Sequence, residues 1–258
     1  MPATDLDLII ETIKGAGDVA LRFAGNAPKS WEKPDGAGPV TEADLAVNDF
    51  LEEKLRSARP DYGWLSEEST DTTDRLTKDR VFIVDPIDGT RSFQEGSRTW
   101  AHSVAVCTDG RITAGAVYLP QRGLLYTAAL GQGAFLNGEP LAVSSKQTIA
   151  EAEVLATKPV LSEAHWPHGL PAFRRSHRPS LAYRLGLVGQ GRFDAMLTFR
   201  PTWEWDVAAG TIIVSEAKGV CTNRQGDKLR FNNASAQLDG MVASGCALHG
   251  ELMSALHP

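Results

Sequence analysis

The chain has 258 residues, of which 42% are hydrophobic and 22% charged, a balance typical of a globular protein large enough to bury a sizeable core. A formal net charge of −6 and the lack of a basic stripe argue against a nucleic-acid polymer as partner. Three widely spaced cysteines without a CxxC pair, no run of transmembrane length and no export signal at the N-terminus lead us to expect a cytoplasmic protein without a membrane partner.

The first part of the chain predicts two amphipathic helices joined by a loop. Apolar residues recur at helical spacing over residues 4–23, and a second helix begins at a Thr cap and runs over residues 41–55. Residues 29–39 between them have the glycines and prolines of a mobile loop. Two charged residues here need no functional role when taken alone. Lys33 is then a solvated side chain, and Asp44 is a carboxylate in the first turn of a helix.

The most informative stretch is VFIVDPIDGTRSF, residues 81–93. Its apolar start, residues 81–84, predicts a short buried strand that delivers Asp85 to its carboxyl end and stops at Pro86. A turn and a helix N-terminus are expected to follow at Asp88. Two carboxylates three residues apart suit a divalent cation, and the amides of the next Gly-Thr pair suit a phosphate oxygen. The plain alternative is a strand, a turn and a helix with two solvated aspartates.

The remaining elements predict a sheet followed by a second α/β layer. A strand over residues 62–65 leads to Glu67, and residues 100–136 have the strand and turn patterns of antiparallel hairpins. Strands and helices then alternate, and we expect them at residues 153–157, 180–188, 193–199, 207–214, 219–226 and 241–245 and in a terminal helix. Taken alone, Glu67 is an exposed charge and Asp206 is the N-cap of the helix that follows it.

Three separated motifs, taken together, resemble the inositol monophosphatase family of magnesium-dependent, lithium-sensitive phosphomonoesterases. They are Glu67-Glu68-Ser69, the DPIDGT stretch at residues 85–90 and the WDVAAG stretch at residues 205–210. The resemblance covers essentially the whole chain and implies a layered α-β-α-β-α sandwich of the α+β class and a homodimer. The haloacid dehalogenase-like phosphatases have DxDGT where this chain has DxxDGT, so we expect no phosphoenzyme.

The resemblance also implies how the chain is divided. We expect a single phosphatase unit over residues 1–258. Within it, residues 1–146 form an N-terminal α+β lobe that carries most metal ligands. Residues 147–258 form a C-terminal α/β lobe that contributes Asp206 and substrate contacts.

Metal ligands follow from the resemblance residue by residue. A first Mg²⁺ is held by Glu67, Asp85 and the carbonyl of Ile87, and a second by Asp85, Asp88 and Asp206. A third, weaker ion uses Glu67 and waters, so the site takes two or three ions. By the same resemblance Mn²⁺ substitutes for Mg²⁺, and Li⁺ or Ca²⁺ inhibits. Clustered carboxylates repel one another without cations, so metal affinity is expected to depend on pH.

The reaction that the resemblance implies is a direct in-line attack by water on a phosphate monoester, with the metal ions activating the water. Thr90, linked to Asp44, orients or deprotonates that water, and Glu67 is counted with them as catalytic. The amides of Gly89 and Thr90 hold the phosphate. Lys33 matches a lysine on the family's mobile loop and is a candidate substrate contact.

The second half of the chain bears on which phosphate ester is cut. Thr198 stands where inositol phosphatases place an acid that receives sugar hydroxyls. The stretch PTWEWD, residues 201–206, looks more like that of bacterial 3′(2′),5′-bisphosphate nucleotidases. We therefore favour adenosine 3′,5′-bisphosphate, with inositol 1-phosphate and then histidinol phosphate as alternatives. An alternative of another class is a catalytically silent relative that binds anions and metal.

Candidate contacts for this small anionic substrate are mostly basic. Arg178 and Arg200 are predicted to meet a second phosphate, since guanidinium groups bind phosphate bidentately. Arg178 belongs to a basic cluster whose plain reading is a solvated loop: Arg174, Arg175, His177 and Arg178. Glu204 is the candidate acid for a polyol substrate instead.

Overall fold

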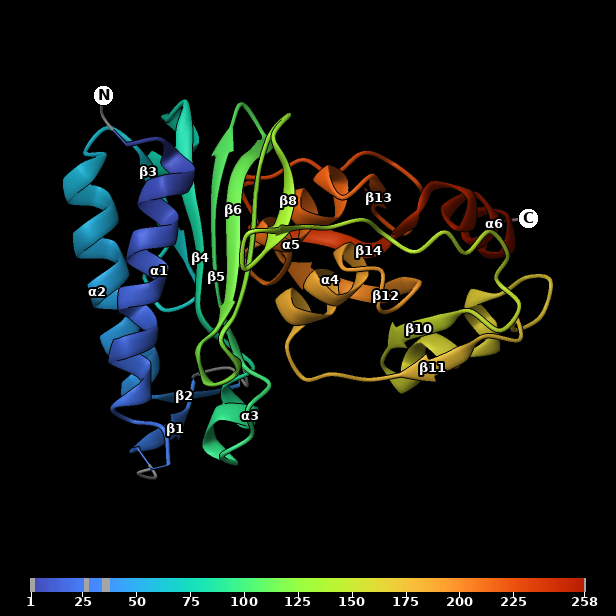
Figure 1. Ribbon diagram of the computed structural model, residues 1–258, viewed down its shortest axis with the longest axis horizontal. Coiled ribbons are helices and arrows are strands. Elements are labelled where there is room, and N and C mark those ends of the chain that lie inside the picture. The colour runs from blue at the N-terminus through green and yellow to red at the C-terminus, as the bar shows by residue number, and fades with distance from the viewer. Residues whose placement is uncertain (1–2, 26–27, 34–37, 258) are drawn as a thin grey trace.

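The computed structural model describes residues 3–25, 28–33 and 38–257. They form five layers in the order helices, sheet, helices, sheet, helix (Figure 1), which confirms the predicted α-β-α-β-α sandwich. The helices are α1 (Asp5–Leu21), α2 (Glu42–Ala58), α3 (Thr90–Gln94), α4 (Leu181–Gly189), α5 (Glu204–Glu216) and α6 (Cys246–Leu256). In the described part of the chain, no helix has the length and apolarity needed to cross a bilayer.

The larger sheet has seven strands in the order β3-β4-β5-β6-β7-β8-β9, with β3 parallel to β4 and all other neighbours antiparallel. Its strands are β3 (Gly63–Ser66), β4 (Arg80–Asp88), β5 (Ala101–Thr108), β6 (Arg111–Leu119), β7 (Leu124–Ala129), β8 (Gly133–Leu136) and β9 (Glu139–Pro140). The hairpins predicted over residues 100–136 are confirmed. The predicted stop at Pro86 is wrong, because β4 continues through a bulge to Asp88.

The second sheet has five strands in the order β11-β10-β12-β14-β13, with parallel and antiparallel neighbours. Its strands are β10 (Glu153–Ala156), β11 (Arg174–Ser176), β12 (Ala195–Trp203), β13 (Gly219–Thr222) and β14 (Gln237–Gly245). The basic residues at 174–176 therefore lie in an edge strand and not in a loop. The division predicted after residue 146 falls in the segment that connects the two sheets.

A small hairpin lies in the region expected to be a mobile loop. Strands β1 (Ser30–Glu32) and β2 (Pro39–Thr41) pair antiparallel, so the prediction of a loop is wrong for these residues. Residues 34–37 of the predicted loop lie outside the described residues. Helix α2 begins directly after β2, and Thr41 is its N-cap as predicted.

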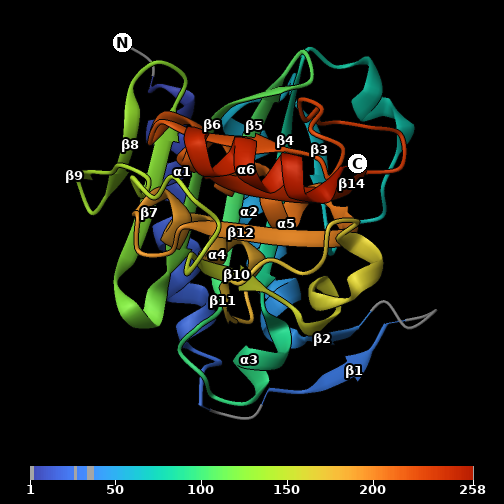
Figure 2. The ribbon, with the colours of Figure 1, turned by 90° about the vertical axis from the view of Figure 1, so that its right-hand side faces the viewer.

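Both faces of the larger sheet are buried, which explains the unbroken apolar run of β4. Phe82 and Val84 pack in the core beneath α1 and α2, whereas Val81 and Ile83 belong to the central core shared with α4 and α5. A third core lies between the second sheet and α6. Figure 2 shows α6 in front of the strands of that sheet. The central core joins both sheets into one unit.

Helix α5 fits into the central layer because its residues are small. A Cβ atom added to Gly210 would lie 2.4 Å from the side chain of Leu185 on α4, and one added to Gly115 of β6 would lie 3.0 Å from Ala209. Glycine and alanine at these contacts allow α5 to pack closely against α4 and the larger sheet at once. This packing fixes the position of the first turn of α5, which carries Asp206.

Candidate active site

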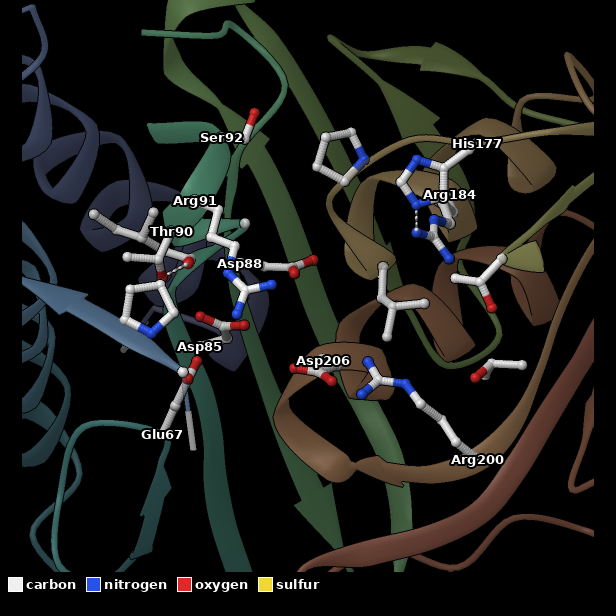
Figure 3. Close-up of a pocket in the computed structure, with 18 residues that line it drawn as sticks. Glu67, Asp85, Asp88, Thr90, Arg91, Ser92, His177, Arg184, Arg200 and Asp206 are labelled. Carbon is white, nitrogen blue, oxygen red and sulfur yellow. Dashed lines mark hydrogen bonds between the residues drawn. The ribbon is translucent and has the colours of Figure 1, made fainter. Parts of the chain in front are cut away.

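A bulge at the end of β4 turns Asp85 and Asp88 toward the same cavity. Asp85 pairs with Ser103 of β5 and Asp88 with Ala101, so two residues of β4 lie opposite the single residue His102. In a regular strand, residues three positions apart face opposite sides of the sheet. The extra residue of a bulge brings them to the same side. Both carboxylates therefore line one cavity of about 350 Å³ (Figure 3).

The chain then enters the short helix α3. Gly89 has a φ of +100°, in the left-handed region that glycine adopts most easily, and Thr90 is the first helical residue. The first hydrogen bond of α3 runs from the amide of Phe93 to the carbonyl of Gly89. The helix therefore makes no use of the Gly89 and Thr90 amides. Both residues line the cavity, next to the aspartates.

Two further carboxylates reach the cavity from other elements. The parallel pairing of β3 with β4 sets Ser66 beside Val84, and so brings Glu67 next to Asp85. Asp206 is the third residue of α5 and is not its N-cap. Carboxylate oxygens of Glu67, Asp85 and Asp206 lie within 4.8 Å of one another. Residues from three distant parts of the chain thus meet at one point.

These carboxylates fit a divalent cation. Oδ1 of Asp85 is buried and has no hydrogen-bond partner among the described residues. Burial, and then the charges of neighbouring carboxylates, raise the pKa values of Asp85 and Asp206 well above their usual range. A bound Mg²⁺ would satisfy the unpaired oxygen and offset the repulsion. Glu67, Asp85 and Asp206, with Asp88 and the carbonyl of Ile87, are the residues that would hold it.

The N-terminus of helix α4 binds one carboxylate oxygen of Asp88. Oδ2 of Asp88 accepts hydrogen bonds of 2.6 Å from the hydroxyl of Ser180 and the amide of Ala182. Because Ser180 is the N-cap of α4, the carboxylate lies at the positive end of that helix. Burial nevertheless raises the pKa of Asp88 to about 6. These bonds engage one oxygen and leave the other for the cavity.

Asp44 reaches Thr90 from the helix layer, as predicted. The Thr90 hydroxyl donates to Oδ1 of Asp44 at 3.0 Å and lies 3.2 Å from the carbonyl oxygen of Ile87. The other oxygen of Asp44 accepts from the amide and the hydroxyl of Thr41. Burial raises the pKa of Asp44 to about 6. Because Thr90 donates inward, its lone pairs remain available to a molecule in the cavity.

Lys33 also reaches the acidic side of the site. Its Nζ lies 2.8 Å from an oxygen of Glu67 and 2.7 Å from an oxygen of Glu68. Burial acts to lower the pKa of Lys33, but these ion pairs raise it overall. Burial also raises the pKa of Glu68, to about 7. Lys33 is therefore a counterion of a predicted metal ligand in this structure.

Basic side chains form a second wall of the cavity, on the side of Asp206 and away from Glu67 and Asp85 (Figure 3). His177, Arg184 and Arg200 all line it. Arg184 is only 3% exposed, and its guanidinium is held by the carbonyl of Arg178 at 2.6 Å and by Nε2 of His177 at 2.8 Å. Burial lowers its pKa to about 10, so it stays charged at neutral pH. Arg184 was not predicted, although an arginine within the apolar helix expected at residues 180–188 was a signal for it.

Two predicted substrate contacts lie elsewhere. Glu204 is completely buried, and its carboxylate accepts hydrogen bonds of 2.6 and 2.8 Å from the amides of Asn232 and Asn233. It cannot receive a substrate hydroxyl, and that prediction is wrong. Arg178 lies over the ring of Phe193, 5.4 Å from its centroid, and is not among the described residues that line the cavity.

The basic cluster at residues 174–178 does not act as one group. Arg174 forms ion pairs of 3.6 and 3.8 Å with glutamates at the surface, and Arg175 donates to a backbone carbonyl of β10 at 3.0 Å. Of this cluster, His177 lines the cavity. Thr198, at the position where inositol phosphatases place an acid, lines the cavity as well.

This geometry defines a class of enzyme. Converging carboxylates favour a divalent cation, and together with the Thr90–Asp44 pair they suit hydrolysis of a phosphate ester assisted by a metal ion. A comparison with protein-family models agrees with this class of enzyme and identifies the family. The model described as the inositol monophosphatase family matches residues 3–258. The chain belongs to this family of phosphoric monoester hydrolases, which depend on Mg²⁺ in general.

Individual relatives agree with this membership. A protein named inositol-1-monophosphatase from Mesorhizobium japonicum is 30% identical over 244 residues, which cover 89% of each chain. A protein named histidinol-phosphatase from Chlorobaculum parvum is 30% identical, and the match covers 98% of this chain and 96% of the relative. A solved structure of an inositol monophosphatase from Thermotoga maritima matches with a TM-score of 0.83 at 28% identity, covering 97% and 96% of the two chains.

Proposed function

We propose that the protein is a Mg²⁺-dependent phosphomonoesterase whose substrate carries a second negative charge, with adenosine 3′,5′-bisphosphate as that substrate. The observation that carries this proposal is the polarity of the cavity. Glu67, Asp85 and Asp88 lie on one wall, and the other wall has Arg184, Arg200 and His177 beside Asp206. The acidic wall repels an anion unless cations are bound there, whereas the basic wall attracts an anion unaided. A substrate with two separated phosphates matches both walls.

The chain's own residues support direct attack by water. Bound Mg²⁺ would supply Lewis-acid stabilisation of the phosphoryl oxygens, and by resemblance to the family two or three ions share the ligands. Thr90 accepts a hydrogen bond from the attacking water while it donates to Asp44, so the pair orients the water. The amides of Gly89 and Thr90 orient the phosphate. The proposed reaction therefore forms no phosphorylated enzyme.

The basic wall argues against the two alternative esters. Inositol 1-phosphate has only hydroxyls beyond its phosphate, so it would place no second anion against Arg184 and Arg200. Histidinol phosphate carries an amine, which a wall of arginines repels. The names of the relatives from Mesorhizobium japonicum and Chlorobaculum parvum nevertheless make both esters necessary arms of the test.

Phosphate release by the Mg²⁺-loaded protein tests the substrate. We expect kcat/KM for adenosine 3′,5′-bisphosphate to exceed that for the other two esters by about 100-fold. Asp88→Asn is the inactive control, because asparagine keeps an oxygen for Ser180 and Ala182 but lacks the charge of a ligand. A preference for inositol 1-phosphate would overturn the substrate and keep the enzyme class. Hydrolysis of none of the esters would indicate a catalytically silent relative.

The role of the basic wall has its own test. Adenosine 3′-phosphate lacks the second phosphate, so wild type should prefer the bisphosphate over it. Arg184→Met and Arg200→Met should each reduce that preference by about tenfold or more, because each removes a charged hydrogen-bond donor to the second phosphate. Activity on adenosine 3′-phosphate is the internal control. An undiminished preference in both variants would exclude these residues from the subsite.

A further inference from the structure

His102 lies opposite the bulge that shapes the metal site. The pairing of Asp85 with Ser103 and of Asp88 with Ala101 leaves two residues of β4, Pro86 and Ile87, facing His102 alone. A bulge leaves backbone groups without a partner in the ladder, and a proline has no N–H to contribute. The carbonyl of Pro86 can accept from a donor outside the backbone of the sheet.

The side chain of His102 is that donor. The residue is completely buried, and its Nδ1 forms a hydrogen bond with the carbonyl oxygen of Pro86. Because a carbonyl only accepts, Nδ1 carries the proton. Nε2 has no hydrogen-bond partner among the described residues, and the ring packs edge-on against Trp100, with the ring centroids 5.4 Å apart. Nothing else in the described residues competes for that proton.

The bond lies on the face of the sheet away from the cavity. Along β5, Val104 and Val106 pack in the core beneath α1 and α2. His102 is two residues before Val104 on the same strand, so its side chain faces the same side of the sheet. The neighbouring carbonyl, that of Ile87, lies on the cavity side, with its oxygen 3.2 Å from the hydroxyl oxygen of Thr90. In extended backbone, successive carbonyls point toward opposite neighbouring strands, so the Pro86 and Ile87 carbonyls point in opposite directions. Holding the Pro86 carbonyl back toward His102 therefore keeps the Ile87 carbonyl turned toward the ligands.

We infer that His102 is a positioning residue for the metal site: its Nδ1–H donor holds the bulge that aims Asp85, the Ile87 carbonyl and Asp88 into one cavity. It touches neither substrate nor metal. The inference rests on the metal site proposed above, and goes beyond it by assigning a role to a residue on the far side of the sheet. Outer partners of metal ligands act in this way in other sites, since they restrict the orientation of the ligating groups.

Three variants distinguish the effect of the hydrogen-bond donor of His102 from the effect of its side-chain volume. His102→Leu removes the donor and fills the space, whereas His102→Asn keeps an N–H donor on the atom that corresponds to Nδ1. Val104→Ala is the matched control, because Val104 is buried on the same strand and face and touches no ligand. Each full-length, metal-free protein is titrated with Mn²⁺, and free Mn²⁺ is measured by electron paramagnetic resonance. Thermal unfolding without metal is measured in parallel.

We expect His102→Leu to weaken Mn²⁺ binding by about 10- to 100-fold and His102→Asn to stay within about threefold of wild type. Val104→Ala should lower the midpoint of unfolding without a change in Mn²⁺ affinity. Wild-type affinity in His102→Leu, or an equal loss in His102→Asn, would overturn the inference. If wild type itself binds no Mn²⁺, the proposed function fails instead.

A measurement on wild type keeps the inference testable if a variant does not fold. The ¹⁵N spectrum of histidine rings distinguishes the two neutral tautomers. We expect His102 to be in the Nδ1–H form throughout the range from pH 6 to pH 8. The Nε2–H form would show that the bond to Pro86 is not made, and would overturn the inference.

Discussion

Thr90 commits its hydroxyl proton to Asp44 and so presents its oxygen to the cavity. A serine at this position keeps the hydroxyl, whereas an alanine removes it. We therefore expect Thr90→Ala to lower kcat by about 100-fold or more, and Thr90→Ser to recover most of the loss. Steady-state kinetics measures both. Mn²⁺ binding by metal-free Thr90→Ala should match wild type, and a kcat within a few fold of wild type would contradict the proposed role.

Single residues differ in how well the sequence predicts them. Glu67 and Asp206 lie in motifs with a fixed spacing to their elements, so their arrival at the cavity follows from family resemblance. Glu204 lies two residues from Asp206 and has the same charge. Its burial is decided by Asn232 and Asn233, which approach from a distant loop, and local sequence does not show such a contact. Arg184 was missed although local sequence carried a signal, an arginine within an apolar helix, and its partners His177 and Arg178 are close in sequence.

Among the secondary-structure elements, α5 is the one most constrained by packing. Gly210 lets it approach Leu185, and an added Cβ would lie 2.4 Å from that side chain. We expect Gly210→Ala to destabilise the fold by about 1–3 kcal/mol through overpacking, measured by urea unfolding. Gly250→Ala in α6 is the matched control, because no atom lies within 4 Å of its added Cβ, and should stabilise by up to about 1 kcal/mol. Equal effects of the two substitutions would contradict this packing argument.

Regular elements were predictable because apolar spacing and caps are local. The helices α1 and α2 begin after Thr4 and Thr41, whose side chains cap them, and the cap at Thr41 was predicted. The bulge of β4 was not predictable, since a proline ordinarily ends a strand. Here β5 continues to pair beyond Pro86, and the side chain of His102 takes the place of a missing ladder contact. That partner is distant in sequence.

Across the whole molecule, stability and catalysis conflict at Asp44. Burial raises its pKa from the usual 3.8 to about 6, so the folded state holds this proton more tightly than the unfolded state. The stabilisation that this provides is complete below about pH 4 and is lost as the pH rises through about 6. Wild type therefore folds at neutral pH with an unfavourable buried charge.

Asp44→Asn should remove the destabilisation that the buried charge of Asp44 causes at neutral pH. We expect the metal-free variant to be more stable than wild type at pH 7.5 by on the order of 1–3 kcal/mol, and the difference to shrink at pH 4.5. Thermal unfolding at both pH values checks the sign. The variant should also have a lower kcat. A stability difference that is the same at both pH values would show that the charge of Asp44 is not its cause.

The carboxylates that meet within 4.8 Å come from sites far apart in the order of synthesis. Glu67 and Asp85 leave the ribosome more than a hundred residues before Asp206, which takes on the order of ten seconds at ordinary translation rates. A nascent chain therefore carries an incomplete acidic cluster until α5 docks. Hydrolysis begins only when α5 has folded onto the earlier part of the chain, so phosphatase activity reports that this contact has formed.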